Sequence, residues 1–484
     1  MIASHLVGFE PVIGLEIHAR LLTQTKIFCG CSTQFGDAPN THVCPVCLGF
    51  PGALPVLNRR AVDFAAKAAL ALNCEVHEES IFARKNYFYP DLPKGYQISQ
   101  YEQPIATHGA LEYTTAGAVK RVRITRVHME EDAGKSLHEG FPESERKTYL
   151  DFNRSGTPLI EIVTEPDLRS AADAADAFRK LREILIALGV NDGNMEEGSL
   201  RCDANVSVRP AGSPTLGTKA EVKNINSFRY LEKALEYEIE RQIHVLESGG
   251  VIVQETRLWD AAARETFSMR SKEDAHDYRY FPDPDLPPVH VSRERIDQIR
   301  GSIIELPEAR RRRMMAEYSL SDPEVTALEG NELTALFEAT ARAAGNARAA
   351  FNWVSGEVAR KLNELGDRFD RRRVTAGALA GLIGLVEKGT ISASTAKSVF
   401  DKMYESGGSA EDIVTAGGLG QIGDEGALLE AVRAVLAANQ DAVAQIRSGK
   451  TGTFGFLVGQ VMKGTGGRAN PTLVNELLRR ELEK

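Results

Sequence analysis

The chain reads VIGLEIHAR at residues 12–20, and apolar and polar residues alternate along this stretch. Successive side chains of a β-strand point to opposite faces of its sheet. One face therefore carries Ile13, Leu15 and Ile17, and the other carries Glu16, His18 and Arg20. The pattern predicts a strand with its apolar face in the core and a carboxylate beside an imidazole on the other face.

The same alternation recurs in LRCDANVSV at residues 200–208 and in KAEVK at residues 219–223. Their polar faces carry Arg201, Asp203, Asn205 and Ser207, and Lys219, Glu221 and Lys223. A fourth segment, VRITRVHMEE at residues 122–131, begins in the same way, but its apolar phase slips near Arg126, which predicts a β-bulge. Because Glu130 and Glu131 are adjacent in a strand, they point to opposite sides, and only one should reach a given ligand.

Glu161 lies within LIEIV at residues 159–163, where every neighbour is apolar. The usual cause of alternation is an antiparallel sheet with one solvated face, and this interpretation stays open for the other strands. The neighbours of Glu161 instead predict burial, which is costly for a carboxylate unless it is paired or binds a cation. A face of carboxylates and histidine suits Mg²⁺, or Mn²⁺, which also accepts imidazole.

A cation at such a face would naturally hold the phosphates of ATP, although the chain has no Walker A loop. GKS at residues 134–136 has Met129 where the upstream glycine should stand, and GKT at residues 449–451 has Ala444 there. Both are decoys. Nucleotide binding should therefore depend on carboxylates that hold a metal and on basic side chains of a sheet.

The run RKNYFYPDLPKGYQISQ at residues 84–100 combines aromatic, basic and amide side chains with two prolines. It matches neither an amphipathic helix nor an alternating strand. We expect a loop that holds polar ligands against a rigid wall.

Four of the six cysteines cluster, and these are Cys29, Cys31, Cys44 and Cys47. In a reducing cytosol such a cluster is more typical of a metal site than of disulfides. Four thiolates form the closed tetrahedral ligand set of structural zinc. Cys74 and Cys202 stand alone, and we expect both to be buried.

The chain has 484 residues, a hydrophobic share of 43% and a formal net charge of −9. Its length predicts more than one globular domain. The acidic balance argues against a generally basic nucleic-acid binder, but it leaves room for a local basic patch. No apolar run is long enough to cross a membrane, and residues 1–5 lack the features of a secretion signal, so we expect a cytoplasmic protein.

Composition changes near residues 281–288, where proline is frequent and after which alanine, leucine and charged residues dominate. We place a domain boundary just after this stretch, at residue 294, and a second at the glycine-rich entry into the tail, between residues 405 and 406. The last helix should begin with Asn470 as its N-cap and Pro471 in its first turn. Its apolar face should carry Val474, Leu477, Leu478 and Leu482.

Together with DFNRSGTPLIEIV at residues 151–163, the run at residues 84–100 resembles the B-subunit family of the glutamyl/aspartyl-tRNA amidotransferases. The resemblance covers essentially the whole chain. Its other blocks are residues 12–18, 128–136, 151–167, 195–205, 219–228, 277–285, 454–462 and 469–478.

The resemblance implies an α+β protein in three parts. They are a glutamine-synthetase-like antiparallel-sheet catalytic (cradle) domain at residues 1–294 with a zinc loop at 29–47, an all-α helical linker at 295–405, and a small helical tail domain of the YqeY type, which binds tRNA, at 406–484. It implies a heterotrimer that also contains an amidase and a small third protein, the A and C subunits. Its further partners would be misacylated tRNA and the misacylating aminoacyl-tRNA synthetase.

The implied reaction is carbon–nitrogen ligation with glutamine as amido donor. ATP phosphorylates the side-chain carboxylate of glutamate or aspartate misacylated onto its tRNA, and ammonia from the amidase then displaces phosphate. The products would be Gln-tRNA(Gln) and Asn-tRNA(Asn).

The resemblance also implies roles for single residues. The catalytic ligands of Mg²⁺ or Mn²⁺ would be Glu16, His18, Glu131 and Glu161. The nucleotide and a second metal would be held by Glu130, Arg201, Asp203, Glu221 and Lys223. The aminoacyl end would meet Lys85, Tyr87, Tyr89 and Lys94, although core packing explains the tyrosines equally well. The structural zinc would be held by Cys29, Cys31, Cys44 and Cys47.

Contact with tRNA phosphates is expected at Lys463 and Arg468, because the glycines between them let backbone amides approach phosphate. The arginine runs at residues 310–313 and 371–373 are weaker candidates, since charge runs usually mark solvated helix faces.

An alternative hypothesis is a non-catalytic scaffold that binds tRNA and is stabilised by zinc. It accounts for the cysteines and the basic clusters but leaves Glu161 unexplained. A third hypothesis, the related archaeal E subunit, requires an inserted synthetase-like domain, for which 484 residues leave no room.

Overall fold

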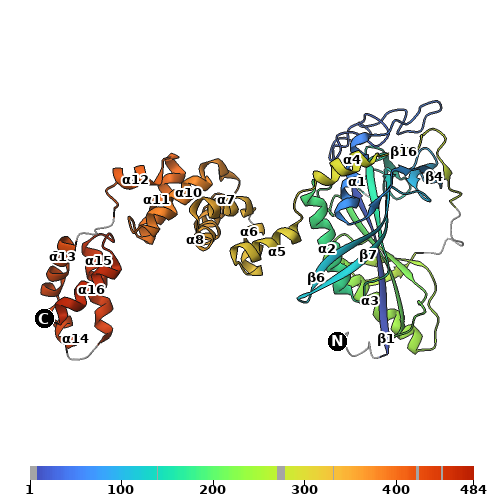
Figure 1. The fold of residues 1–484 in the computed structure, drawn as a ribbon. Helices are drawn as coiled ribbons and strands as arrows, with labels where there is room; N and C mark the ends of the chain where they lie inside the picture. The colour runs from blue at the N-terminus through green and yellow to red at the C-terminus, as the bar shows by residue number, and fades with distance from the viewer. Residues whose placement is uncertain are drawn as a thin grey trace. The chain divides into compact units, whose positions relative to one another are not determined.

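The computed structural model describes residues 8–138, 140–269, 278–330, 332–420, 425–447 and 451–483. Residues 1–5, Asp277, Gly449 and Lys450, on which sequence expectations fell, lie outside these ranges. The chain forms two compact units, Met1–Pro307 and Glu308–Lys484, each with its own core (Figure 1).

A nine-stranded sheet organises the first unit, in the order β14-β13-β12-β11-β1-β10-β7-β6-β2. All neighbouring strands are antiparallel except β12 and β13, which are parallel. The α+β class with a mostly antiparallel sheet is therefore confirmed. The strands are β1 (Phe9–Arg20), β2 (Glu75–Val76), β6 (Ala106–Thr115), β7 (Ala118–Glu131), β10 (Pro158–Thr164), β11 (Leu200–Pro210), β12 (Ala220–Lys223), β13 (Thr256–Asp260) and β14 (Glu265–Ser268).

Three smaller sheets complete the first unit. They are β15 (Phe281–Pro282) with β4 (Phe82–Asn86) and β5 (Tyr96–Gln100), β16 (Val289–His290) with β3 (Glu79–Ser80), and β8 (Lys135–Leu137) with β9 (Tyr149–Asp151). The run at residues 84–100 is thus not a loop throughout, because its two ends pair as β4 and β5. These strands have five residues each, which is too short for their alternation to stand out between the aromatic residues.

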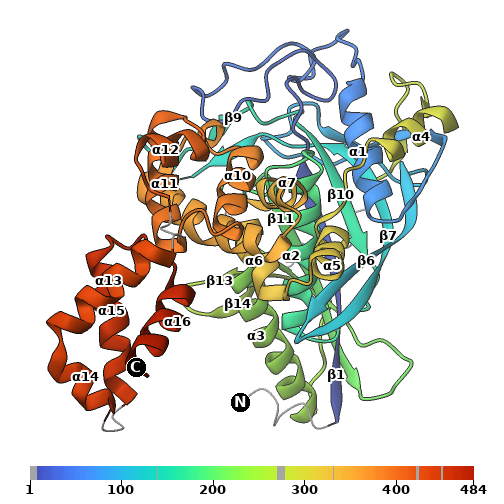
Figure 2. The same cartoon turned by 60° about the vertical axis from the view of Figure 1, so that its left-hand side comes forward.

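Helices α1 (Arg59–Ala71), α2 (Ala171–Ala187) and α3 (Phe228–Glu247) pack against the apolar side of the large sheet (Figures 1 and 2). Each begins where a side chain caps the first turn, and the capping residues are Asn58, Ser170 and Ser227. The residues Ile13, Leu15 and Ile17 of β1 are buried in the same core as the helices, as the alternation predicted. The polar side chains of the strands are left on the opposite face.

The first unit continues past residue 294, where the sequence had suggested its end. Helix α4 (Arg293–Gly301) buries Ile296 and Ile299 in the first core. Its Arg295 also donates to the carboxylate of Asp63 in α1 at 2.6 Å. The proline-rich stretch at residues 281–288 precedes this helix, and the unit continues to Pro307.

The second unit is helical and contains two hydrophobic cores. The first core is formed by residues between Met314 and Val414. It includes α12 (Ala410–Ala416), which lies beyond the domain boundary expected at residue 405. The second core is formed by residues between Leu428 and Leu478. The helices of this unit are α5 (Pro307–Tyr318), α6 (Asp322–Gly330), α7 (Thr334–Ala344), α8 (Ala347–Asn352), α9 (Ala359–Leu365), α10 (Ala376–Glu387), α11 (Ala393–Ser406), α12 (Ala410–Ala416), α13 (Glu425–Ala438), α14 (Gln440–Arg447), α15 (Phe454–Gly464) and α16 (Pro471–Leu482). A π-helical turn spans Trp353–Val358, and 3₁₀ turns span Gly366–Arg368, Arg371–Arg373 and Thr451–Thr453.

The prediction for the last helix is confirmed. Asn470 caps α16 by accepting from the amides of Thr472 and Leu473, and Pro471 lies in the first turn. Val474, Leu477 and Leu478 are buried in the core of the tail. Among the helices described, none combines the length and the apolar character needed to span a bilayer.

Candidate active site

Strands β1, β10 and β7 lie side by side, and their register brings three predicted segments together. His18 pairs with Glu161, and Glu161 pairs with His128. The register of β7 against β10 shifts at Thr125, which confirms the bulge predicted near Arg126. Because paired residues share a face, the three side chains project from the same side of the sheet.

The carboxylate of Glu161 lies between two imidazoles. Its Oε2 is 3.4 Å from His18 Nε2 and 3.4 Å from His128 Nε2. His18 Nε2 is also 3.9 Å from an oxygen of Glu16 and 3.9 Å from an oxygen of Glu130. Glu161 is buried, as its apolar neighbours predicted. Three carboxylates and two imidazoles therefore form one cluster, which we call the Glu–His cluster: Glu16, His18, His128, Glu130 and Glu161.

The charges of this cluster depend on one another. Burial opposes ionisation of Glu161, but His128 and His18 hold the pKa of that carboxyl below its usual range. Burial also lowers the pKa of His128, yet Glu161 and Glu130 outweigh it and raise that pKa to about 9. Burial and the charge of Glu161 raise the pKa of Glu16. The carboxylates of the cluster thus favour positive charge beside them, and a divalent cation bound by neutral imidazoles would supply it.

Two overlapping sets of donor atoms within the cluster are close enough to hold a cation. The atoms of Glu16, His18 and Glu161 lie within 4.8 Å of one another, and so do those of His128, Glu130 and Glu161. Sequence reasoning missed His128. The signal was available, because His128 and Glu130 are two residues apart in the same strand and therefore share a face.

Glu131 lies outside the Glu–His cluster. Both of its carboxylate oxygens accept from Lys94, and one also accepts from the backbone amide of Ile98 at 2.9 Å. Glu130 and Glu131 therefore point to different sides of β7, as alternation predicted. The structure places Glu130, rather than Glu131, beside His18.

A second row of polar side chains continues the same face on β11 and β12. Arg201 pairs with His18, and Asp203 pairs with Glu16. Lys223 Nζ lies 2.9 Å from Asp203 and 3.1 Å from Glu221. These two carboxylates outweigh burial and raise the pKa of Lys223. The five residues assigned by resemblance to the nucleotide and a second metal thus lie on or beside one continuous polar surface.

Aromatic side chains cluster around the predicted residues of the 84–100 run. The ring of Tyr87 lies 5.9 Å from that of Tyr89 and 6.0 Å from that of Tyr278, and Lys85 Nζ lies 4.8 Å from the ring of Tyr278. Tyr89 is 49% exposed, so core packing does not account for it. Sequence reasoning missed Tyr278, which reaches this cluster from a distant part of the chain.

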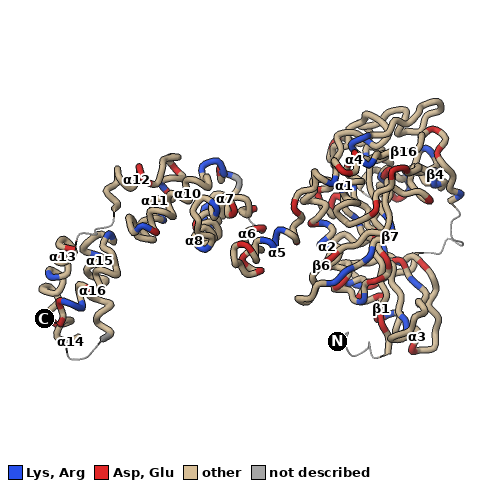
Figure 3. The backbone as a smooth tube through the Cα atoms, viewed as in Figure 1, with Lys and Arg blue, Asp and Glu red and all other residues tan. Residues whose placement is uncertain are grey.

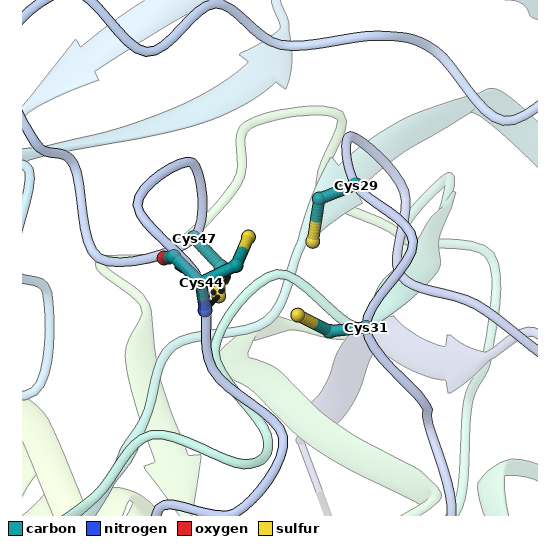
Figure 4. A group of neighbouring side chains, drawn as sticks. All are labelled: Cys29, Cys31, Cys44 and Cys47. Carbon is teal, nitrogen blue, oxygen red and sulfur yellow. Dashed lines mark hydrogen bonds between the residues drawn. The ribbon is translucent and has the colours of Figure 1, made fainter.

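The four clustered cysteines face one another from two loop segments (Figure 4). Their sulfur atoms lie within 4.8 Å of one another. A hydrogen bond from Cys29 lowers the pKa of Cys47 to about 4. Sequence reasoning missed Lys26, which is fully buried and donates to Cys47 Sγ at 3.5 Å.

Lys26 has no carboxylate within ion-pair distance among the described residues. Its other partners are neutral backbone carbonyls of His42, at 2.7 Å, and Phe152, at 3.1 Å. A buried ammonium is costly without a negative partner. Thiolates are the nearest source of that charge. The remaining cysteines, Cys74 and Cys202, are buried as expected.

A cavity of about 350 Å³ lies between the loop at residues 29–47, which we call the cysteine loop, and the run at residues 84–100. Cys47 and Lys26 line one side of it, and Lys94 and Glu131 line another. The cavity therefore lies between the predicted zinc site and the predicted site for the aminoacyl end, and its lining does not include the Glu–His cluster.

In the second unit, Lys463 and Arg468 are both exposed. Between them, Gly466 and Gly467 adopt positive φ angles of 62° and 75°. The arginines of the other two basic runs form ion pairs within the unit, where acidic and basic residues are interspersed (Figure 3). The contacts include Arg311 with Glu329 at 2.7 Å, Arg313 with Glu338 at 2.6 Å and Arg371 with Glu332 at 3.1 Å.

Comparison with known proteins agrees with this architecture. Residues 11–297 match the family model described as the GatB/GatE catalytic domain, and residues 335–482 match the model described as the GatB domain. The chain is 54% identical to a protein of Geobacter sulfurreducens over 99% of this chain and 100% of that one. It is also 54% identical to a protein of Carboxydothermus hydrogenoformans, over 98% and 99%. Both relatives are named as the B subunit of an aspartyl/glutamyl-tRNA(Asn/Gln) amidotransferase. The chain therefore belongs to the GatB/GatE family.

Proposed function

We propose that this chain is the B subunit of a tRNA-dependent amidotransferase, a carbon–nitrogen ligase that uses glutamine as its amido donor. Its substrates are glutamate or aspartate misacylated onto tRNA(Gln) or tRNA(Asn). Full-length identity of 54% to proteins named for this activity supports the assignment. The single structural observation that carries it is the buried Glu161 carboxylate between His18 and His128.

The chemistry requires activation of a carboxylate. A carboxylate oxygen of the substrate attacks the γ-phosphorus of ATP, and the bond to ADP breaks. Ammonia then attacks the acyl carbon, and phosphate leaves with one carboxylate oxygen. Without phosphorylation, the leaving group would be oxide, so charge stabilisation around the phosphoryl group is the main demand on the protein.

Glu16, His18 and Glu161 are proposed to hold the catalytic cation, because hard oxygen ligands with an imidazole suit Mg²⁺ or Mn²⁺. When bound, the cation offsets the negative charge of the transferred phosphoryl group. The family resemblance assigns Glu131 as a further ligand, whereas the geometry favours Glu130. To bind the cation, the carboxylate of Glu131 would first have to release the ammonium group of Lys94.

Arg201, Asp203, Glu221 and Lys223 are proposed to bind the nucleotide and a second cation. They follow the Glu–His cluster along the same sheet face. Lys85, Tyr87, Tyr89 and Lys94 are proposed to receive the aminoacyl end of the tRNA. Exposed aromatic rings such as Tyr89 suit stacking on an unpaired base.

The four cysteines are proposed to bind a structural zinc ion. Their donor set has the tetrahedral thiolate chemistry of such sites, and zinc with four thiolates carries a net negative charge. Buried Lys26 supports this, because its ammonium would lie beside that charge. The zinc would order the loop rather than contact the substrate.

The partners proposed for this chain are an amidase, which is the A subunit of the heterotrimer, the small C subunit and the misacylating synthetase. Ammonia must come from another protein of the assembly, because the sequence lacks an amidase Ser-Ser-Lys signature. The tail is proposed to contact tRNA phosphates through Lys463 and Arg468. We also propose that the large sheet forms a glutamine-synthetase-like cradle.

The experiment that tests the proposal is amidation by the assembled enzyme on both charged tRNAs, with and without ATP. We expect amide formation to require ATP and to be lost in Glu161→Gln, while tRNA binding is retained. Unaltered amidation in Glu161→Gln would favour the non-catalytic scaffold. Using both tRNAs also shows whether glutamyl-tRNA, aspartyl-tRNA or both are substrates.

A further inference from the structure

Beside the Glu–His cluster lies a small basic pocket that none of the roles above explains. Its volume is about 90 Å³. Three cationic side chains line it, Arg20, Lys135 and Arg154, and residues 33–37 of the cysteine loop form another wall. Arg154 belongs to the conspicuous run at residues 151–163, and Lys135 belongs to the GKS sequence that does not form a Walker A loop.

Three guanidinium groups converge on one buried carboxylate, and two of them, those of Arg20 and Arg154, also line this pocket. The Asp132 carboxylate lies 3.1 Å from Arg201, 3.6 Å from Arg20 and 3.7 Å from Arg154. Asp132 is 4% exposed. One negative charge cannot offset three positive charges, so this group alone leaves an excess of positive charge in a partly buried position.

Neutral carbonyl groups hold two of these arginines in place. Arg20 donates to the carbonyl oxygens of Glu197, at 2.6 Å, and Gly198, at 3.2 Å. Arg154 donates to Ala133 at 2.8 Å and also to Gly134. Carbonyls orient a guanidinium without cancelling its charge. The arginines are thus preorganised for an anionic ligand.

The pocket also has two acidic residues, but both are engaged elsewhere. Asp37 lies 2.7 Å from His42 Nε2. Asp151 accepts from the backbone amides of Asn40, at 3.1 Å, and Asn153, at 3.0 Å. Among the lining residues, Arg20, Lys135 and Arg154 against Asp37 and Asp151 leave one net positive charge.

The pocket lies next to the proposed phosphorylation centre. Arg201 is the direct cross-strand partner of His18, and Arg20 follows His18 by two residues on the same face of β1. Two residues of a strand span about 7 Å. A phosphate group in the pocket and a phosphoryl group at the Glu–His cluster could therefore belong to one polyphosphate chain.

We propose that Arg20, Lys135 and Arg154 form a phosphate-binding subsite for the reaction assigned above, an inference that rests on the proposed function. The ligand chemistry is a phosphate group bearing negative charge. The nearby Glu–His cluster favours a non-transferred phosphate of ATP as its source. The alternative source is the phosphodiester next to the aminoacylated end of the tRNA.

The test compares Lys135→Gln and Arg154→Gln with Arg121→Gln, an exposed arginine on β7 that serves as a matched control. Equilibrium binding of ATP, ADP and inorganic phosphate to the full chain needs no turnover. We expect each pocket variant to weaken ATP and ADP binding about tenfold, since each removes a charged contact to phosphate. Lys135→Arg should restore binding, and circular dichroism should show that each variant is folded.

The two phosphate sources give different results. A phosphodiester ligand would leave ATP affinity unchanged and raise the KM of the assembled enzyme for charged tRNA about tenfold. Unchanged ATP affinity together with unchanged tRNA KM in Lys135→Gln, which does not depend on the folding of Arg154→Gln, would overturn the proposal. Failure of the proposed function is distinguishable, because the binding measurements remain readable if the wild-type enzyme forms no amide.

Discussion

The Glu–His cluster and the cysteine cluster are both candidate metal sites, but they are built differently. Glu16, His18, His128, Glu130 and Glu161 come from three paired strands, whose register would hold them in place whatever they bind. The cysteines come from two loop segments rather than from paired strands (Figure 4). Losing a ligand of the first cluster should therefore impair chemistry, whereas losing a ligand of the second should impair folding.

The largest expected effect belongs to the cysteine cluster. Structural zinc can contribute on the order of 10 kcal/mol to folding. We expect Cys44→Ser to lower the melting temperature sharply and to reduce the zinc content, while turnover per folded molecule changes much less. Thermal unfolding and metal analysis of freshly purified protein measure both quantities.

Cys74→Ser is the matched control, because it changes a buried cysteine outside the cluster. It should cost about 1–3 kcal/mol, the usual effect of burying an imperfectly paired polar group. A zinc-free wild-type protein, or equal destabilisation by the two variants, would contradict the structural zinc site.

For the Glu–His cluster the expected pattern is reversed. Glu161→Gln keeps the size of the side chain and removes its charge, so amide formation should fall on the order of 10³-fold. The melting temperature should change less than in Cys44→Ser. Single-turnover amidation measures the loss.

Glu10→Gln is the control for this variant, since Glu10 lies on the same strand and face, where it pairs with Arg209. Its turnover should match the wild type. If both variants retain activity, the sheet face is not the phosphorylation centre.

Much of this arrangement follows from the sequence. The alternation in β1 and β11, the bulge in β7 and the burial of Glu161 were all predictable, because strand periodicity reports which side of a sheet each residue occupies. The sequence could not show which strands are neighbours. His128 and Glu130 meet Glu161 only because β7 pairs with β10, and this pairing depends on long-range packing.

Tertiary contacts also explain the other differences between the sequence-based predictions and the structure. Lys94 and Glu131 are 37 residues apart, and nothing in either segment predicts their ion pair. Lys26 meets Cys47 only after the loop closes. The end of the first unit shifted from residue 294 to Pro307 because α4 packs on the first core, whereas composition records only the change in residue types.

A smaller expected effect, on Mn²⁺ affinity, distinguishes Glu130 from Glu131 as the carboxylate that completes the ligand set of the Glu–His cluster. The geometry predicts that Glu130→Gln weakens Mn²⁺ binding about tenfold or more and that Glu131→Gln leaves it nearly unchanged. Titration of Mn²⁺ followed by electron paramagnetic resonance measures both affinities. The reverse order would show that Glu131 leaves Lys94 and joins the ligand set when the cation binds.

The smallest effect concerns pH. Glu161 and Glu130 outweigh burial and raise the pKa of His18 above its ordinary value of 6.5. A metal ligand must be deprotonated, so protons compete with the cation below that pKa. Mn²⁺ affinity should rise with pH, by at most about tenfold per unit, and level off above the pKa of His18. A pH-independent affinity between about pH 6 and 8 would exclude His18 as a ligand.

The most direct test follows one oxygen atom. When the side-chain carboxylate of misacylated glutamate is labelled with ¹⁸O, phosphorylation of that carboxylate requires that the released phosphate carry one labelled oxygen. We predict one ¹⁸O per phosphate with the wild-type assembly and loss of labelled phosphate in Glu161→Gln. Unlabelled phosphate alongside amide formation, or undiminished labelling in Glu161→Gln, would contradict the account.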